Sequence, residues 1–474
     1  MPSYLALDLG ASSGRAVLGT LAAGRMEVRE LHRFATPLVT DAAGHLVWDL
    51  GALEAECREG LRRALADAPD LRSVSVDAWG VDYVPLAEDG APLRPPFAYR
   101  DRRHDGQMEA SFARMPRRAQ YGHAGIQFLP FNTVYQVLAD PPGERARTAT
   151  RLFVADWLNH RLGGEAVAEE TMASTSGALD VRTRHWSDPL LAGVGLETPA
   201  EAHGWPRLVP PGTVTGQTPE GVAVVATCSH DTAAAVAAVP ADPGTRWAFL
   251  SLGTWGLIGV ERAEPVLTDA ACDASFTNEA GLDGTVRFLK NTSGLFLLEE
   301  AVRGWTSEGR FGGYDALLAD AAASTFDATV DLDHPTLATP GPVAPRLAAL
   351  LNAGPDRVPD PVRVEGLLPG DVARCLLRSL AAALARHFGT LAALTGTRPD
   401  VLHVVGGGAR NALLCGWIAE ACGVPLVAGP VEATALGNLL VQARTLGDLS
   451  PGTTVRTVAR ASSALAAFDP ASTP

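Results

Sequence analysis

The sequence predicts an α/β fold built as two similar halves. Apolar strand-like stretches alternate with amphipathic helical stretches along most of the 474 residues, a pattern typical of α/β domains. A strand–turn–strand pattern at 4–20 returns at 245–261, near mid-chain. Between the halves, the segment VPADPG at 239–244 places two prolines and a glycine where a hinge or boundary is expected. We therefore expect two domains, residues 1–240 and 241–474.

The individual elements follow from the spacing of apolar residues. Near two-residue periods on both sides of a small-residue turn predict paired strands at 4–20 and 245–261, whereas the 371–395 pattern has the length and period of a long helix. Further helices are predicted at 52–66, 107–120, 151–162, 231–239 and 431–444, and further strands at 72–86 and 222–228. Residues 401–423 read as a strand, a glycine turn and a helix.

Composition excludes several classes of function. The net charge is −14, and the sequence has no basic cluster large enough for a nucleic-acid surface. Six cysteines lie far apart without a CxxC pair, so we expect neither a disulfide framework nor a zinc site. The first apolar run contains Asp8 and lacks a basic leader, and 18 uninterrupted apolar residues occur nowhere. We expect a soluble cytoplasmic protein, monomer or homodimer, with no membrane partner.

Two turns have the composition of anion sites. Asp8-Leu9-Gly10-Ala11-Ser12-Ser13-Gly14-Arg15 opens the first half, and Leu252-Gly253-Thr254-Trp255-Gly256 opens the second. Small residues let backbone N–H groups approach a phosphate closely, and a carboxylate such as Asp8 can hold Mg²⁺ through water. Each turn alone could equally be an ordinary hairpin. The occurrence of one such turn in each half suggests that both close on one phosphate chain.

Two further segments carry possible chemistry. Gly406-Gly407-Gly408 follows a strand without forming GxGxxG or a P-loop, and it could seat an adenine ring or serve only for close helix packing. Asp231 stands where the helix after ATCSH begins. From this position alone it could be a helix-capping residue or a general base that the helix N-terminus keeps ionised.

A mixed polar and aromatic segment suggests a sugar site. VDAWGVDYV at 76–84 combines carboxylates, aromatic residues and a glycine at a strand end, as carbohydrate pockets do; a strand with a glycine kink is the simpler alternative. GIQFLPFNT at 125–133 is a loop rich in apolar aromatics. It could line a pocket or merely cover a core.

Taken together, the motifs resemble the FGGY carbohydrate kinases of the actin/Hsp70-type ATPase superfamily. The resemblance rests on the following segments, which occur in order over roughly residues 4–468: DLGASSGR, WGVDYV, AYRD, GIQFLPFNT, SHDTA, LGTWGLIG, LKN, VGGG with Asn411, and GPVEATALGN. It implies two ribonuclease H-like (actin-like ATPase) domains flanking a deep catalytic cleft, the first binding sugar and the second nucleotide. It implies ATP and Mg²⁺ as cofactors and a ketose, phosphorylated on its C1 hydroxyl, as substrate.

The resemblance also assigns residues. On the nucleotide side, it places in one ATP-phosphate loop Ala11, Ser12, Ser13, Gly14 and Arg15, with Thr254 in the other loop and Gly407 beside the nucleotide. The implied sugar contacts are Gly80, His230, Asp231, Thr232 and Asn291. Asp231 is implied to accept the proton, and Asp8 to be a water-mediated Mg²⁺ carboxylate. Two positions depart from the family pattern. Glu299 stands where a glutamine on the ATP side is expected, and Ala78 replaces a threonine. A carboxylate at 299 repels phosphates unless it faces Mg²⁺ or solvent.

Substrate chemistry adds one expectation, and alternative functions remain. A 6-deoxy ketose carries a methyl group, for which Phe128 and Phe131 could form an apolar wall worth about 1–3 kcal/mol of discrimination. The alternatives are a sister kinase for another ketose or polyol, and a non-catalytic sugar-sensing relative, which predicts a damaged Asp8, Asp231 or glycine turn. An Hsp70-like ATPase would need a peptide-binding β-domain, and 320–370 is too short and Pro/Ala-rich for one.

Overall fold

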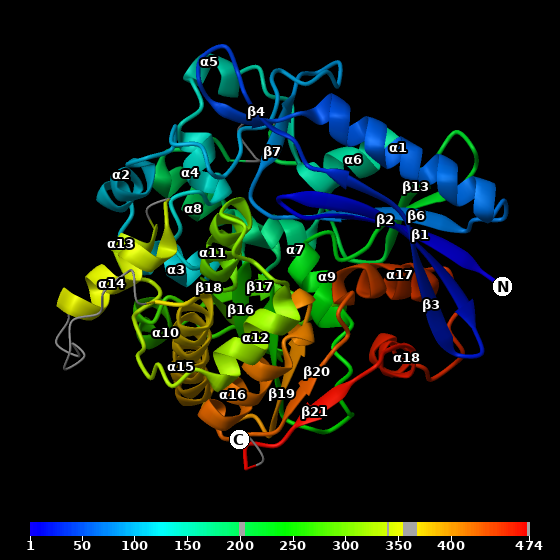
Figure 1. The fold of residues 1–474 in the computed structure, drawn as a ribbon. Coiled ribbons are helices and arrows are strands. Elements are labelled where there is room, and N and C mark those ends of the chain that lie inside the picture. Colours follow the sequence, from blue (N-terminus) through cyan, green and yellow to red (C-terminus); the bar gives the residue numbers. More distant parts are fainter. Residues whose placement is uncertain (199–203, 339–340, 354–366, 472–474) are drawn as a thin grey trace. The chain divides into compact units, whose positions relative to one another are not determined.

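A computed structural model describes residues 1–198, 204–338, 341–353 and 367–471. The chain forms two compact units (Figure 1). Unit 1 comprises 1–242, 260–289 and 432–463, and unit 2 comprises 243–259, 290–431 and 464–474. The predicted break at 240/241 lies two residues from the end of the first segment of unit 1. A single break does not describe the rest of the chain, which returns to unit 1 at 260–289 and at 432–463. Strands β16 (Trp255–Arg262) and β18 (Val286–Ser293) cross the unit boundary.

Unit 1 is built on a six-stranded sheet in which the central strand is completely buried. Strand β1 pairs antiparallel with β2 and parallel with β6, and all seven of its residues are buried. The order is β13 (Thr213–Gln217), β14 (Ala223–Ala226), β6 (Ser73–Ala78), β1 (Ser3–Leu9), β2 (Ser13–Ala22) and β3 (Arg25–Ala35). Shorter pairs are β4 (Leu38–Thr40) with β5 (Leu46–Trp48), β7 (Tyr83–Leu86) with β8 (Thr150–Phe153), β10 (Leu179–Asp180) with β11 (His185–Trp186), β12 (Leu208–Val209) with β9 (Ala168–Glu169), and β17 (Thr277–Ala280) with 286–289 of β18.

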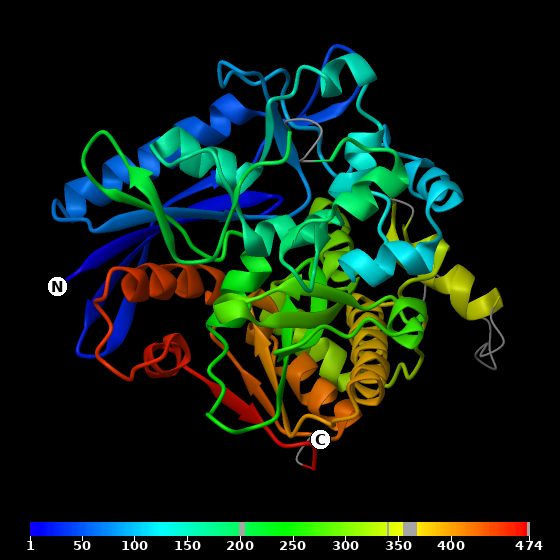
Figure 2. The same cartoon turned by 180° about the vertical axis from the view of Figure 1, so that it is seen from behind.

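Helices cover both faces of this sheet. Figures 1 and 2 show α1 (Leu50–Asp67) and α6 (Val154–Leu162) on one face and α17 (Ala433–Thr445) on the other. Helix α17 packs against α9 (Asp231–Ala237), and a Cβ at Gly437 would lie only 1.9 Å from the carbonyl oxygen of Ala234, so this crossing requires glycine. Other helices of unit 1 are α2 (Gln107–Arg114), α3 (Arg117–Ala124), α4 (Thr133–Leu138), α5 (Pro142–Arg145), α7 (Glu170–Ala173), α8 (Asp188–Val194), α10 (Asp269–Asp273) and α18 (Val455–Ser462).

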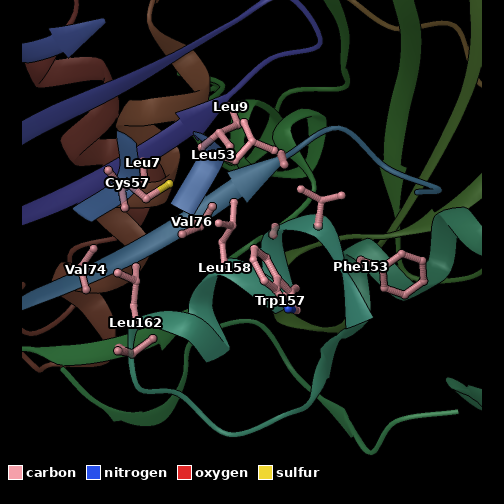
Figure 3. Packing of buried hydrophobic residues seen from close by; sticks show 14 of the residues in the cluster. Leu7, Leu9, Leu53, Cys57, Val74, Val76, Phe153, Trp157, Leu158 and Leu162 are labelled. Atoms are coloured by element: carbon pink, nitrogen blue, oxygen red, sulfur yellow. The ribbon is translucent and has the colours of Figure 1, made fainter. Parts of the chain in front are cut away.

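The main core of unit 1 lies between the sheet and helices α1 and α6. Figure 3 shows the side chains converging from both sides: Leu7 and Leu9 from β1, Val74 and Val76 from β6, Leu53 and Cys57 from α1, and Trp157, Leu158 and Leu162 from α6. Fully burying such a side chain contributes roughly 1.5–3 kcal/mol. This packing holds the ends of β1 and β6, where Asp8 and Asp77 lie, in a fixed register.

Unit 2 repeats the strand arrangement of unit 1. Its sheet runs from the end of β18 through the start of β16 to β15 (Trp247–Leu252), β19 (Val401–Val405), β20 (Leu426–Ala428) and β21 (Ala466–Phe468). Strand β15 pairs antiparallel with β16 and parallel with β19, as β1 pairs with β2 and β6. The helices are α11 (Phe296–Ser307), α12 (Tyr314–Ala323), α13 (Pro335–Ala338), α14 (Val343–Ala353), α15 (Pro369–Thr395) and α16 (Ala412–Cys422). The echo predicted between the two halves is therefore real.

Most predicted elements are present, with three corrections. The predicted strand at 72–86 is two strands, β6 and β7, which belong to different sheets. The predicted helix at 107–120 is two helices, α2 and α3, and the predicted helix at 151–162 begins only at Val154, because 150–153 form strand β8. The 320–370 segment, judged too short for an Hsp70-type peptide-binding domain, lies partly outside the described residues. In the described part of the chain, no helix has the length and apolar character needed to cross a membrane.

Candidate active site

The first turn of unit 1 is held from within the sheet and is open at its tip. Ser12 is exposed, Ala11 and Ser13 are half-buried and Gly14 is buried. The backbone N–H of Gly10 donates to the carbonyl of Ser13 at 2.9 Å, which closes the turn between β1 and β2. The N–H groups of Ala11 and Ser12, which precede strand β2, make no backbone hydrogen bond within the described chain, so this tip is suited to an anion.

Asp8 and Arg15 form an ion pair at the base of this turn. They face each other across the β1–β2 ladder, and Arg15 donates to Asp8 at 2.5 Å and also to Glu432, just before helix α17. Burial raises the pKa of Asp8 although Arg15 acts to lower it. The structure thus brings together Asp8 and Arg15, two of the predicted site residues, in one ion pair. Glu432 is a partner that the sequence did not indicate.

A second buried carboxylate stands beside Asp8 on the neighbouring strand. Asp77 pairs in register with Asp8 and is fully buried; burial and the charge of Asp8 raise its pKa well above the usual value. Oδ2 of Asp77 accepts from Asn438 on α17 at 2.6 Å, and Asn438 in turn accepts from Gln442 at 2.7 Å. Oδ1 of Asp77 has no hydrogen-bond partner among the described residues. This network ties α17 to the strand ends.

The side chain of Asp231 makes its hydrogen bonds at the start of helix α9. His230 is the residue before the helix, and Asp231 is its first residue. Oδ1 of Asp231 accepts from the N–H of Thr232 at 2.5 Å and from its hydroxyl at 3.1 Å, so this oxygen bonds the first turn of the helix, whereas the N-cap residue is His230, which makes no side-chain cap. The side chain remains 32% exposed, and in the described chain no hydrogen bond reaches Oδ2. One oxygen of Asp231 is therefore bonded within the first turn of the helix, and the other is available to a substrate.

The residues around His230 and Gly80 are joined by a buried framework. Ala78 bridges to His230 in parallel fashion, and the buried Glu169 accepts from the N–H of Ser229 at 2.9 Å. Burial raises the pKa of Glu169 to about 7. The framework brings the predicted positions Gly80 and His230 to neighbouring strand ends.

Backbone strain marks the residue after Gly80. Val81 has a φ of +71°, which is rare for a β-branched residue and costs on the order of 1–3 kcal/mol. Its N–H donates to the hydroxyl of Thr175 at 3.2 Å, and its carbonyl accepts from Thr133 at 2.6 Å. Strain of this kind clusters at functional sites, and the sequence motif gave no sign of it.

In unit 2, the second turn is tied to helix α11. The hydroxyl of Thr254 donates to Glu299, 3.2 Å from Oε2 and 3.4 Å from Oε1. The N–H groups of Leu295 and Phe296, at the start of α11, donate to the carbonyls of Gly253 and Thr254 at 2.8 and 3.3 Å. The structure therefore joins Thr254 and Glu299, which the sequence placed on the ATP side without predicting their contact.

Two other predicted residues of unit 2 lie on separate elements. Asn291 is half-buried in β18, and Gly407 is exposed at the start of a short 3-10 helix, Gly407–Arg410, that follows β19. A Cβ at Gly407 would meet no atom within 4 Å, so the space beside this backbone is open, as a flat ring would need. Asn411 caps helix α16 by accepting from Leu414 at 3.0 Å.

The two phenylalanines predicted as an apolar wall have different surroundings. Phe128 packs edge-on against Phe112, with ring centroids 5.1 Å apart, and lines a small hollow with Gln127 and Asn132. The ring of Phe131 lies 5.5 Å from that of Tyr99. Both residues are half-buried, so the loop covers a core and also borders a hollow.

The donor set fits a magnesium ion bound together with phosphates. Mg²⁺ usually takes one or two carboxylates and keeps several waters, and Asp8 supplies a carboxylate at the base of the first turn. The described residues include no group of three or more histidine, cysteine or acidic side chains that could hold a metal ion by themselves. A site of this composition would need the phosphate oxygens of a nucleotide to complete it.

Comparisons with known proteins agree with this geometry. The model for the N-terminal domain of the FGGY family of carbohydrate kinases matches residues 3–237, and the model for the C-terminal domain matches 248–446. The chain thus belongs to the FGGY family of carbohydrate kinases and is a sugar kinase that uses ATP. The family predicted from the ordered motifs is confirmed.

Two relatives make the comparison more particular. The chain is 36% identical over 459 residues to a rhamnulokinase of Bacteroides thetaiotaomicron, covering 94% of this chain and 91% of that one. It is 38% identical over 478 residues to a rhamnulokinase of Enterobacter sp. (strain 638), covering 98% and 94%.

Solved structures support the fold. A ligand-bound xylulose kinase from Lactobacillus acidophilus superposes with a TM-score of 0.78 at 15% identity, covering 99% of this chain and 94% of that one. Glycerol kinase of Plasmodium falciparum with ADP superposes with a TM-score of 0.78 at 14% identity and the same coverage. The predicted two-domain α/β fold class is confirmed.

Proposed function

We propose that the protein transfers the γ-phosphoryl group of ATP to the C1 hydroxyl of L-rhamnulose, giving L-rhamnulose 1-phosphate and ADP. The single observation that carries the chemistry is the asymmetry of the Asp231 carboxylate, whose Oδ1 accepts from Thr232 in the first turn of α9 while the side chain stays one-third exposed. The choice of sugar is supported by the near full-length similarity to two rhamnulokinases.

The proposed roles divide between the two units. Sugar binds against Gly80, His230 and Thr232 of unit 1, with Asn291 contributing from unit 2. The phosphates of ATP lie on the turns at 11–15 and 253–256, and the adenine lies against Gly407. That both units face one cleft remains a prediction from the sequence. When bound, Mg²⁺ neutralises phosphate charge, and Asp8 would hold it through water.

Oδ2 of Asp231 is the proposed proton acceptor. The sugar hydroxyl gives its proton to this oxygen as the hydroxyl oxygen attacks the γ-phosphorus and the bond to the bridging oxygen of ADP breaks. Positioning and charge neutralisation provide most of the rate in such transfers, and a general base typically adds 10²–10⁴-fold. The intact Asp8, Asp231 and glycine turns argue against a non-catalytic relative.

The test replaces only the base. Asp231→Asn keeps an oxygen that can accept from Thr232, so we expect a fold-preserving loss of about 10²–10⁴-fold in kcat with little change in the KM for sugar. Asp188→Asn is the matched control because Asp188 is also the first residue of a helix, α8. Asp231→Asn at near wild-type speed would return Asp231 to a capping role.

The substrate is tested by a panel. L-Rhamnulose, L-fuculose, xylulose, fructose and glycerol are compared in a coupled ADP assay, and the phosphorylated carbon is assigned by NMR. We expect kcat/KM to be highest for L-rhamnulose. Replacing Phe128 or Phe131 by Ala should reduce the preference for the 6-methyl ketose by about 1–3 kcal/mol; unchanged preference in both variants would exclude the proposed wall.

A further inference from the structure

Arg287 is a completely buried cation beside the proposed sugar site. It lies on the part of β18 that belongs to unit 1, directly opposite Glu279 on β17, and its side chain is 0% exposed. Nη2 of Arg287 is 3.1 Å from Oε2 of Glu279, and Nε donates to the carbonyl of Ala280 at 2.9 Å. The guanidinium is therefore fixed in place by the strand pair.

The same Nη2 also contacts His230. It lies 3.2 Å from Nδ1 of His230, whereas Oε2 of Glu279 is 3.5 Å from that nitrogen. A guanidinium carries only donors and stays protonated, so Nδ1 must accept at this contact. A neutral imidazole whose Nδ1 accepts carries its proton on Nε2.

Glu279 keeps this arrangement electrically balanced. Burial is the strongest single influence and acts to raise its pKa, but the charge of Arg287, together with the contacts of Glu279 to His230 and Thr277, holds the pKa of Glu279 below its usual value. The two side chains therefore form an ion pair of opposite charges inside unit 1. A buried ion pair of this kind contributes little net stability. Stability alone therefore does not explain why Arg287 also contacts His230.

The other nitrogen of His230 points to the proposed base. Nε2 lies 3.4 Å from Oδ1 of Asp231, the oxygen that already accepts from the N–H and hydroxyl of Thr232. Thr232 thus donates two hydrogen bonds to this oxygen, and Nε2 of His230 lies beside the same oxygen at a longer distance. In the described residues, Oδ2 receives no hydrogen bond.

We propose that Arg287, balanced by Glu279, is a positioning residue that holds neutral His230 with its proton on Nε2, so that His230 and Thr232 occupy Oδ1 of Asp231 and Oδ2 is left to accept the proton of the sugar hydroxyl. This rests on the proposed function for its catalytic consequence. The orientation of His230 is a property of the free protein and can be tested without substrate.

The first experiment reads the tautomer directly. Side-chain ¹⁵N NMR of histidine-labelled full-length protein at neutral pH, assigned with His230→Gln, is expected to show His230 protonated at Nε2 only. A wild-type His230 protonated at Nδ1, or at both nitrogens, would overturn the proposal.

The second experiment removes the arginine without leaving a buried charge. In Glu279→Met/Arg287→Met both charges are replaced by apolar side chains, a change that is often close to neutral for stability. We expect the His230 tautomer to change and kcat to fall about 10- to 100-fold, the range found when the partner orienting a ligating histidine is lost. The KM for ATP should not change. Arg287→Lys, which keeps one donor, should restore part of kcat.

Controls separate positioning from stability. Arg151→Met removes another buried arginine of unit 1, which bonds the carbonyl of Gly204, and should leave the His230 signals and kcat unaltered. A folded double variant with wild-type kcat would overturn the positioning role. If the wild type phosphorylates no sugar of the panel, the proposed function fails, and the NMR result still decides the orientation of His230.

Discussion

The two phosphate turns are built alike but are fastened differently. In each, a glycine N–H closes the turn at 2.9 Å, from Gly10 to Ser13 in unit 1 and from Gly253 to Trp255 in unit 2. The first turn is fastened by charge, since Arg15 bonds both Asp8 and Glu432. The second is fastened by a neutral hydroxyl, which Thr254 donates to Glu299.

The difference shows that a shared strand order does not dictate the electrostatics of a site. Asp8 is buried and would be costly without a cation, so its turn contains an ion pair at a strand crossing. Glu299 is half-buried on a helix, and the contact that holds its turn is with a hydroxyl and not with a cation. Removing the residue that holds the turn should therefore lower the free energy of unfolding more in the first turn than in the second.

Removing the cation of the first turn should have the largest effect. Arg15→Met leaves Asp8 buried without its partner, and we expect the free energy of unfolding to fall by about 3 kcal/mol, the lower end for a broken buried pair. Chemical denaturation measures this loss. The control is Arg33→Met on the adjacent strand β3, where the ion pair with Glu30 is exposed and worth about 0–1 kcal/mol. Equal losses in both variants would contradict the comparison.

A third carboxylate separates burial from charge pairing. Asp82 is fully buried and accepts only from neutral donors, Trp48 at 2.7 Å, Trp79 at 3.1 Å, Tyr99 at 3.0 Å and Gln136 at 2.9 Å. Burial raises its pKa from 3.8 to about 6. The fold thus favours the protonated form, and this contribution to stability is complete below about pH 3.8 and is lost as the pH rises through 6.

Asp82→Asn should remove that pH dependence. Raising the pKa by this amount corresponds to about 3 kcal/mol, so the unfolding free energy of the variant relative to wild type should rise by about that much from pH 4 to pH 7. Asp101→Asn gives the opposite sign: burial acts to raise the pKa of Asp101, but hydrogen bonds from Leu46 and Arg103 hold it low. A variant at 82 that tracks the wild type at every pH would show that Asp82 is ionised throughout.

The next largest effect is expected from the close packing of Gly294 against the backbone of the second turn. A Cβ at Gly294 would lie 2.4 Å from the backbone carbon of Trp255 and 2.5 Å from the carbonyl oxygen of Gly253. Because backbone atoms cannot rotate away, Gly294→Ala should destabilise the protein by about 1–3 kcal/mol and raise the KM for ATP. Gly304→Ala, inside α11 with nothing within 4 Å, should instead stabilise slightly, by about 0.5–1 kcal/mol. Thermal unfolding distinguishes the two.

The sequence was sufficient for features that depend on local chemistry. The small-residue turns, the helix that begins at Asp231 and the repeated strand–turn–strand pattern all follow from neighbours along the chain. The strand at 150–153 was missed because its four residues pair with β7 at 83–86, and this tertiary pairing overrides the local helical period.

Long-range partners could not be predicted in the same way. Asp77 and Asn438 are 361 residues apart, and Arg287 meets His230 across 57 residues. Each residue alone is unremarkable in the sequence; only the packing of α17 and the register of β17 with β18 bring the pairs together. Val81 was missed for another reason, since its positive φ accompanies backbone hydrogen bonds with Thr175 and Thr133, which are distant in the sequence.

The smallest expected effect concerns the residue that departs from the family pattern. Glu299→Gln keeps an acceptor for the Thr254 hydroxyl but removes a negative charge from the proposed phosphate side. We expect the KM for ATP to fall about fivefold, or about 1 kcal/mol, with kcat and stability almost unchanged. Glu308→Gln, at the exposed end of the same helix, should change neither constant. Steady-state kinetics at fixed free Mg²⁺ measures both, and a higher KM in Glu299→Gln would show that this carboxylate helps to bind MgATP, so that the second turn, like the first, depends on charge.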